Sequence, residues 1–357
     1  MDVKKRSTKI VRYILVLGIV GGMLLLQNFS GRQPVFEQKD KLSEYGFFQN
    51  PLADLNPVQD VIPYDLNTPL FSNYAEKLRF VKVPPGEKVK YNDSLAFEFP
   101  VGTILIKNFL YYTDFRKKEK GRRILETRLL VHERDGWNAY PYIWNEEQTE
   151  AFYDPAGEAI EIKYTDHNGK KVTTSYLIPN KNQCKGCHIR GEEVKPIGPT
   201  ARNLNKDHLY TTGLRNQLVY WKDQGVLQQL PEFSFVPKLP VWNDPQSGDL
   251  DSRARAYLEV NCGHCHNRRG PASTSGLFLD IYEHDKGHFG INKAPVAAGR
   301  GAGNMEYDIM PGQPSNSILI FRMKTNDPAI AMPEIGREQV HKEGVALIEE
   351  WIKKMPL

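Results

Sequence analysis

Two short stretches of the sequence place cysteine and histidine at a spacing that supports haem chemistry. Each contains Cys-x-x-Cys-His, the pattern at which c-type haem is attached covalently. The cysteines are expected to form thioethers to the haem vinyl groups, and each histidine to become the proximal iron ligand. All four cysteines of the chain lie in these stretches, so the sequence predicts two covalently bound haems. The motif residues are Cys184, Cys187 and His188, then Cys262, Cys265 and His266.

Paired cysteines also occur in dithiol redox sites and in zinc sites, and both alternatives explain less of the sequence. Residues 262–265 read Cys-Gly-His-Cys, as in a disulfide isomerase, but that interpretation leaves His266 and the motif at Cys184 as coincidences. Structural zinc sites space their cysteine pairs by about 12 to 20 residues. Cys187 and Cys262 are much further apart.

Methionines after the second motif offer a sixth ligand, since cytochromes c usually complete the iron with a methionine sulfur. Met332 lies in a short loop before the last predicted helix, so we expect it to ligate the iron at His266. Met310 is the second choice, and Met323 ends an apolar run that is typical of a core. The candidates after His266 are Met305, Met310, Met323, Met332 and Met355.

The sixth ligand of the first haem stays open, because no methionine lies between His188 and Met305. The sixth ligand could be a histidine, a methionine from the second domain or another donor, or the position could be open. The local histidines are His132, His167 and His208, each more typical of a surface position, with His132 favoured because it ends a predicted strand. We expect this haem to have a low potential, with a distal side that is ligated by histidine or open.

The proximal histidine of the first haem also needs a partner for its second ring nitrogen. Gly198-Pro199 resembles the Gly-Pro that follows the haem motif in class I cytochromes c, in which the proline carbonyl accepts the other N–H of the proximal histidine. The resemblance implies a hydrogen bond from His188 to the carbonyl of Pro199.

Charge and the N-terminus indicate the compartment. The 357 residues carry 47 basic and 43 acidic side chains, a near-balanced surface that argues against nucleic-acid binding. A basic run over residues 4–12 precedes an apolar run over residues 13–26. We interpret residues 1–30 as an uncleaved signal-anchor, with a cleaved signal as the alternative. The remaining chain is then expected on the periplasmic side of the cytoplasmic membrane.

The elements that must position these motifs fall into two predicted domains after a linker at residues 31–60. Residues 61–240 are predicted as a β-rich, sandwich-like domain with the first haem site. Their β-type runs cover residues 80–83, 96–99, 103–113, 123–133, 160–165 and 171–177, the last two flanking Asn168-Gly169, which favours a type I′ hairpin.

Residues 241–357 are predicted as a mainly α-helical, cytochrome c-like domain with the second haem site, which makes the chain α+β. A helix over residues 253–258, capped by Asp249 or Asp251, runs into Cys262. A second helix over residues 339–355 places Val345 and Ile348 on one apolar face with the tryptophan and isoleucine that follow. This pair of helices resembles a class I cytochrome c.

Residues 40–357 as a whole resemble a bacterial family of dihaem c-type cytochromes. The resemblance implies a secreted or membrane-tethered protein with two haems. It is carried by Ile62-Pro63-Tyr64-Asp65-Leu66-Asn67, Pro100-Val101-Gly102-Thr103, Glu126-Thr127-Arg128, Tyr142-Ile143-Trp144-Asn145, Ile197-Gly198-Pro199 and Met332-Pro333-Glu334.

The leading functional prediction is electron transfer, in which the haems supply the redox chemistry and the protein sets potential and access. The expected partner is a redox protein: a dehydrogenase, a quinol oxidase or a terminal reductase. One alternative is a peroxidase-like dihaem enzyme whose first haem has an open position. A third is a passive haem-binding subunit of a dehydrogenase.

Overall fold

The computed structural model describes residues 36–356. The predicted signal-anchor at residues 1–30 lies outside the described residues. Among the helices of residues 36–356, none combines the length and the apolar character that crossing a bilayer requires.

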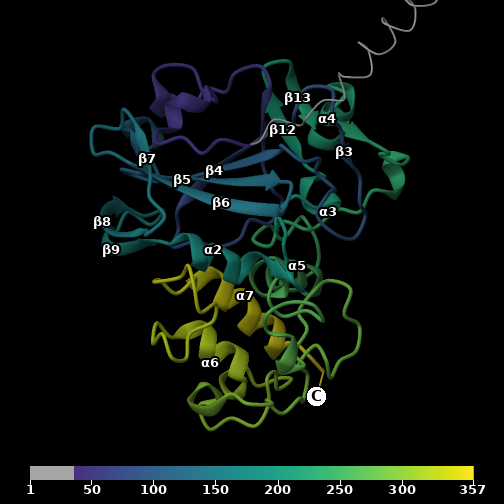
Figure 1. The fold of residues 1–357 in the computed structure, drawn as a ribbon. Coiled ribbons are helices and arrows are strands. Elements are labelled where there is room, and N and C mark those ends of the chain that lie inside the picture. Colours follow the sequence, from purple (N-terminus) through teal and green to yellow (C-terminus); the bar gives the residue numbers. More distant parts are fainter. Residues whose placement is uncertain (1–35, 357) are drawn as a thin grey trace, which may run out of the picture. The chain divides into compact units, whose positions relative to one another are not determined.

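A six-stranded antiparallel sheet forms the centre of the N-terminal half, in the order β1-β2-β4-β5-β6-β7 (Figure 1). Strand β4 reads Ile-Leu-Ile-Lys-Asn-Phe-Leu-Tyr-Tyr, and nearly all of its residues are buried because both faces of the sheet are covered. The strands are β1 Val61–Tyr64, β2 Glu76–Lys82, β4 Ile104–Tyr112, β5 Arg122–Glu133, β6 Gly136–Trp144 and β7 Ala151–Tyr153.

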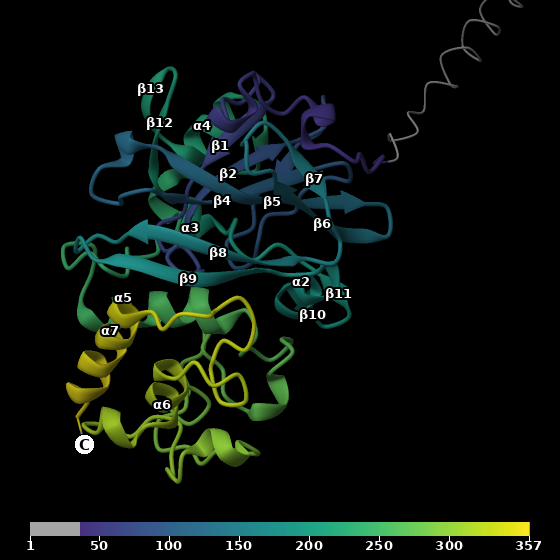
Figure 2. The ribbon, with the colours of Figure 1, turned by 90° about the vertical axis from the view of Figure 1, so that its left-hand side faces the viewer.

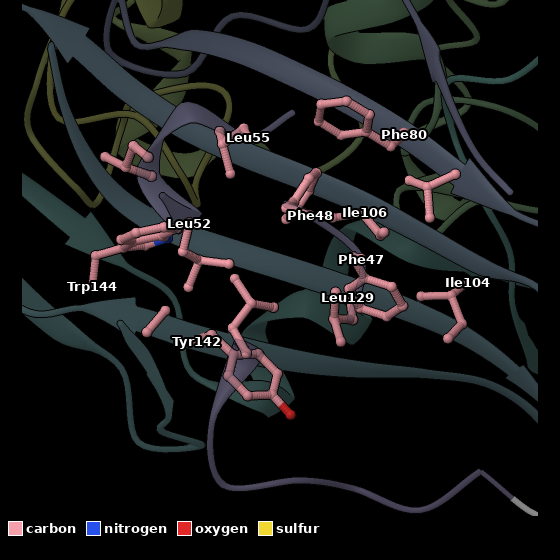
Figure 3. Close-up of a cluster of buried hydrophobic side chains, with 14 of the residues drawn as sticks. Phe47, Phe48, Leu52, Leu55, Phe80, Ile104, Ile106, Leu129, Tyr142 and Trp144 are labelled. Atoms are coloured by element: carbon pink, nitrogen blue, oxygen red, sulfur yellow. The ribbon is translucent and has the colours of Figure 1, made fainter. Parts of the chain in front are cut away.

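The chain before β1 covers one face of this sheet. Residues 36–58 contain two short 3₁₀ turns, Leu42–Tyr45 and Leu52–Asp54. Their aromatic and leucine side chains pack onto Phe80, Ile106 and Leu129 (Figure 3). The prediction of a linker over residues 31–60 is therefore wrong for residues 36–58, whose apolar side chains belong to the core.

The opposite face of the sheet is covered by different elements at its two ends. At one end, Leu105 packs with α3 Ala201–Leu204 and α4 Gln217–Asp223. At the other end, Phe109 packs with the hairpin of β8 Glu158–Thr165 and β9 Lys171–Ile178. Figure 2 shows this hairpin beneath the sheet, on the side of helices α5 and α7. Between these two ends the sheet faces a cavity.

Short elements complete the N-terminal half. They are the parallel pair β3 Val89–Lys90 and β14 Leu227–Gln228, the hairpins β10 Ile189–Arg190 with β11 Glu193–Val194 and β12 Asp207–Tyr210 with β13 Gly213–Asn216, and helix α2 Lys181–His188.

Three helices pack together in the C-terminal part: α5 Leu250–Leu258, α6 Ile318–Lys324 and α7 Lys342–Lys353. The predicted cap is confirmed, since Asp249 Oδ1 accepts a hydrogen bond of 2.7 Å from Ser252 N. The predicted apolar face of the last helix is also buried, with Ile348 fully enclosed. Helices α5 and α7 approach closely at Gly344, where a Cβ atom would lie 2.3 Å from Tyr257 Oη.

The predicted fold class is wrong on two counts. A sandwich needs a second sheet against the first, whereas here one face is covered by the N-terminal segment and the other by helices, a hairpin and a cavity. Nor is the C-terminal part mainly α-helical, because no α-helix lies between α5 and α6 except the turn that carries the second motif. That long stretch is rich in Gly, Pro and Asn, which favour turns and loops.

Residues 66–75 connect the sheet-containing half to the helical part through polar contacts. At its start, Asn67 Nδ2 donates to the carbonyls of Arg202 and Asn205 (3.2 and 3.0 Å), which anchors the segment to α3 within the sheet-containing half. Further along the segment, Asn73 Oδ1 accepts hydrogen bonds from the backbone N–H groups of residues 338 and 339 (2.8 and 3.1 Å). We call residues 66–75 the connecting segment.

Candidate functional site

Helix α2 presents the first motif on one face. Asn180 and Gln183 form a capping box at its start, with reciprocal hydrogen bonds of 2.9 Å between each side chain and the other backbone N–H. Residues three and four apart lie on the same side of a helix. The side chains of Cys184, Cys187 and His188 therefore project together, and all three line the cavity.

A backbone carbonyl fixes the orientation of the first histidine. His188 Nδ1 lies 2.8 Å from Lys195 O, so this nitrogen carries the proton and Nε2 is left to bind a metal. The predicted acceptor was the carbonyl of Pro199, and this prediction is wrong. That carbonyl accepts a hydrogen bond from Phe97 N (3.0 Å), because the Gly-Pro segment pairs with the chain beside the sheet instead.

The second motif follows α5 without a break. The helix continues through a π-helical turn, Glu259–Gly263, an irregularity that is common at functional sites. Gly263 allows the backbone of this turn to lie close to the backbone of Leu279, because a Cβ atom at residue 263 would lie only 3.0 Å from Leu279 O. His266 Nδ1 lies 3.3 Å from Leu277 O, which again leaves Nε2 free to bind a metal.

Both histidines are held in the form that binds metals. Burial lowers the pKa of His188 to about 4, and the nearby charge of Lys107 adds to this effect. Burial likewise lowers the pKa of His266 to about 4. Each imidazole is therefore neutral at pH 7 and can donate an electron pair from Nε2.

One cavity of about 1220 Å³ contains both motifs. It exceeds the roughly 300–1,000 Å³ of a typical pocket for one small ligand. The sheet, α2, the connecting segment and the loops around α5 and α6 form its walls. The sequence did not indicate that the two motifs share a single space.

The two motifs meet within this cavity at their second cysteines. Hydrogen bonds from the Cys265 thiol and from His264 lower the pKa of Cys187, and the same thiol contact raises the pKa of Cys265. Cys184 is also affected, because burial raises the pKa of its thiol. None of the four cysteines forms a disulfide, and all four are partly buried.

Met332, the predicted sixth ligand of the second haem, lies on the cavity wall. Its backbone N–H donates to Arg322 O (3.1 Å), which anchors the loop between α6 and α7. Of the methionines in the described part of the chain, only Met332 and Met323 line the cavity. Met323 is 5% exposed and packs in the helical core, so Met332 is the freer of the two sulfurs.

None of the three histidines considered for the first haem lines the cavity. His132 stacks on Trp137 with ring centroids 4.6 Å apart, and its Nδ1 lies 2.8 Å from Phe99 O. His167 packs beside Phe115, and His208 lies on the β12–β13 hairpin. Their positions do not support the prediction that His132 is a ligand.

A row of basic side chains on the sheet was missed by the sequence reasoning. Strand register aligns Arg79 on β2, Lys107 on β4 and Arg128 on β5, and all three line the cavity. We call these three residues the basic row. Burial, followed by the charge of Arg79, lowers the pKa of Lys107 well below its usual value. The sequence feature that could have indicated the basic row is the single lysine at the centre of an apolar strand.

The residues around the cavity fit two covalent haems. They supply thiols, free imidazole nitrogens and apolar walls, together with cations for the propionate groups. Buried Nε atoms without a hydrogen-bond partner in residues 36–356 support this fit, since a bound anion would satisfy them. Three of these atoms, on Arg190, Arg202 and Arg337, belong to cavity-lining residues.

Zinc fits less well than haem. A structural zinc ion needs about four ligands at one point. Within residues 36–356, no group of three or more Cys, His, Asp or Glu side chains is arranged to hold a metal ion. A haem iron has a different requirement, because the porphyrin supplies four donors and the protein only the axial ones.

Comparison with known proteins gives no relative for this chain. No family model, no curated protein and no solved structure matches it. The functional argument therefore rests on the site.

Proposed function

We propose that this chain is a dihaem c-type cytochrome that transfers electrons on the periplasmic side of the cytoplasmic membrane. The observation that carries the proposal is the single cavity that both Cys-x-x-Cys-His motifs line. The contact between the Cys187 and Cys265 thiols supports it, because it brings the two attachment motifs together. Haems held by these motifs would supply one-electron redox chemistry.

Each protein group has a defined part in this proposal. Haem supplies one-electron redox chemistry when bound. His188 and His266 hold the irons, and their backbone partners keep the rings from turning. Met332 completes the second iron and raises its potential. Arginine and lysine side chains on the walls balance the propionate charges.

We propose further that the chain belongs with the dihaem cytochromes its sequence resembles and exchanges electrons with a redox protein. A dehydrogenase, a quinol oxidase and a terminal reductase are the candidate partners. The basic and apolar runs of residues 4–26 support either membrane anchoring or export.

The test is to count covalent haems and trace each one to its motif. The denatured full-length protein should show a mass increment of two haems and a c-type pyridine haemochrome. Replacing Cys184 and Cys187 by alanine should remove one haem, and replacing Cys262 and Cys265 should remove the other. Retention of both haems in either double variant would refute the proposal.

A peroxide assay separates an electron carrier from the peroxidase-like alternative. The fully loaded protein is mixed with hydrogen peroxide and a reduced donor. An electron carrier should show no turnover above that of free haem. Steady turnover that is lost with the first motif would assign the enzyme function instead.

A further inference from the structure

The basic row places one amine at the centre of the sheet face that borders the cavity. Lys107 is paired in register with Arg79 on one side and with Arg128 on the other. Leu105 and Leu130 continue the same face of the sheet as apolar neighbours. Lys107 is thus enclosed by two cations and an apolar surface.

The two arginines have carboxylate partners and Lys107 does not. Arg79 pairs with Asp65 (3.3 Å), and Arg128 binds Glu126 through two hydrogen bonds of 2.5 and 2.6 Å. Within residues 36–356, the side chain of Lys107 has no hydrogen bond or ion pair, and its Nζ lies 4.8 Å from the centre of the Phe109 ring.

This arrangement is costly unless something in the cavity uses the amine. Like charges directly opposite each other in a sheet are destabilising, and the half-buried Lys107, which lines the cavity, has no side-chain partner among the described residues that would offset this cost. A guanidinium cannot ligate iron, because it stays protonated and has no acceptor. Among the described cavity residues that come from the sheet, Lys107 has the only amine.

We propose that Lys107 Nζ is the sixth ligand of the first haem, on the side away from His188. The inference rests on the proposed function. The covalent bonds and the proximal histidine all come from α2, which is packed beneath the sheet (Figure 1). The sheet is therefore the part of the cavity wall that meets the other face of a haem held by α2.

Two histidines on the cavity wall are less suitable. His264 lies beside Cys187 and lowers the pKa of its thiol, which places the ring near the point where the thioether would form. His341 lies 2.9 Å from Tyr257 Oη through Nδ1 and stacks on Phe71 with ring centroids 4.1 Å apart. These contacts hold His341 against α5 and the connecting segment, away from α2.

The test compares Lys107→Arg with the unaltered, fully loaded protein. Arginine has a similar length but stays protonated and cannot ligate, so the iron of the first haem should change from low-spin to high-spin. Ferric EPR should then lose half of the low-spin signal, and imidazole added to the protein should restore it. Lys107→Ala should behave in the same way. The pyridine haemochrome should still report two haems in each variant.

A matched control is Lys77→Ala on neighbouring β2. Lys77 does not line the cavity, and its Nζ donates to Leu70 O (2.7 Å). Both haems should stay low-spin in this variant.

Several results would overturn the assignment. They are a first haem that is high-spin before any substitution, retention of its low-spin signal in Lys107→Arg, and loss of that signal in His264→Ala. A protein without covalent haem would instead refute the proposed function itself, so the two failures are distinguishable.

Discussion

At the scale of single residues, His188 and His266 are oriented in the same way. Each residue is half-buried and places Nδ1 near a backbone carbonyl further along the chain. Backbone acceptors cannot rotate away, so each ring keeps the tautomer that leaves Nε2 free to bind a metal.

Substitution of Met332 tests the ligand of the second haem. Met332→Ala should abolish the weak near-infrared sulfur-to-iron band and lower the potential of the haem at His266, because a thioether favours the ferrous state. Met310→Ala is the control, since Met310 does not line the cavity. If the band survives Met332→Ala and disappears in Met310→Ala, the ligand has been assigned to the wrong methionine.

Substitution of Glu126 tests the compensation of charge in the basic row. Glu126 is fully buried, binds Arg128 and accepts a hydrogen bond of 2.6 Å from Tyr176 Oη. Glu126→Gln leaves Arg128 beside Lys107 without its carboxylate, at a cost on the order of 3 kcal/mol. Denaturant unfolding measures this loss.

The exposed pair of Lys163 and Glu161 serves as the reference for Glu126. Glu161→Gln should change the free energy of unfolding by less than about 1 kcal/mol. Equal effects of the two substitutions would show that the basic row needs no compensation.

At the scale of secondary-structure elements, the crossing of α5 and α7 positions the second motif. Gly344 lets α7 lie against the Tyr257 ring, and Trp351 Nε1 donates to Asp251 Oδ1 (2.7 Å). The helix that leads into Cys262 is thereby fixed at both its ends. The position of the motif depends on this crossing as well as on α5 itself.

The close packing of α5 against α7 predicts whether Gly344→Ala raises or lowers the stability of the protein. Alanine in place of a helical glycine normally stabilises a helix by about 0.5–1 kcal/mol. Gly344→Ala should instead destabilise the protein by about 1–3 kcal/mol, because the added Cβ would overlap the buried Tyr257 ring. Thermal unfolding measures the change, with Ala346→Ser at an exposed position of α7 as the control. A rise in stability would show that the helices separate easily.

The sequence predicted those elements correctly whose pattern lies within a short stretch of the chain. Strand β5, helix α5 with its Asp249 cap and the buried face of α7 follow from alternation, capping and helical spacing. The β8–β9 hairpin was also expected, but Asp166 accepts hydrogen bonds from Asn168 N and Lys170 N, and the loop is longer than a two-residue type I′ turn. Side-chain capping within a loop leaves no periodic signal.

Long-range packing was not predictable in the same way. The aromatic residues of 36–58 alternate irregularly with polar ones, so the sequence suggests a linker. Their role in the core follows only from the sheet that they cover. Lys107 was overlooked because one lysine in a strand is ordinarily a surface residue. Its cross-strand neighbours, Arg79 and Arg128, are distant in sequence, and only strand register brings them together.

At the scale of the whole described structure, the two Cys-x-x-Cys-His motifs line one cavity. Charges that are close together in a protein interior interact more strongly than in water. With haems bound as proposed, an electron on one centre would therefore make reduction of the other less favourable. The proposed first haem, without a sulfur ligand, should have the lower potential of the two.

A redox titration tests this interaction. The potential of the first haem should be higher in the variant that lacks the second haem, Cys262→Ala with Cys265→Ala, than in the intact protein. Spectroelectrochemistry of the full chain and of this variant gives the comparison, and Met332→Ala is the control that keeps both haems. An identical potential in the intact protein and the variant would show that the centres are electrically independent.

The connecting segment has a consequence for how this protein is assembled in the cell. Apolar packing holds the sheet to its own covering segments and the helices to each other, while the cavity occupies the place between them where a core would lie. The halves are joined by polar contacts such as those of Asn73, by the stack of Phe71 on His341 and by one small apolar cluster around Leu239 and Val260. Under the proposed function, haems bound in the cavity would complete the contacts between the halves. The chain without haem should then be cleaved by proteases more readily than the loaded protein.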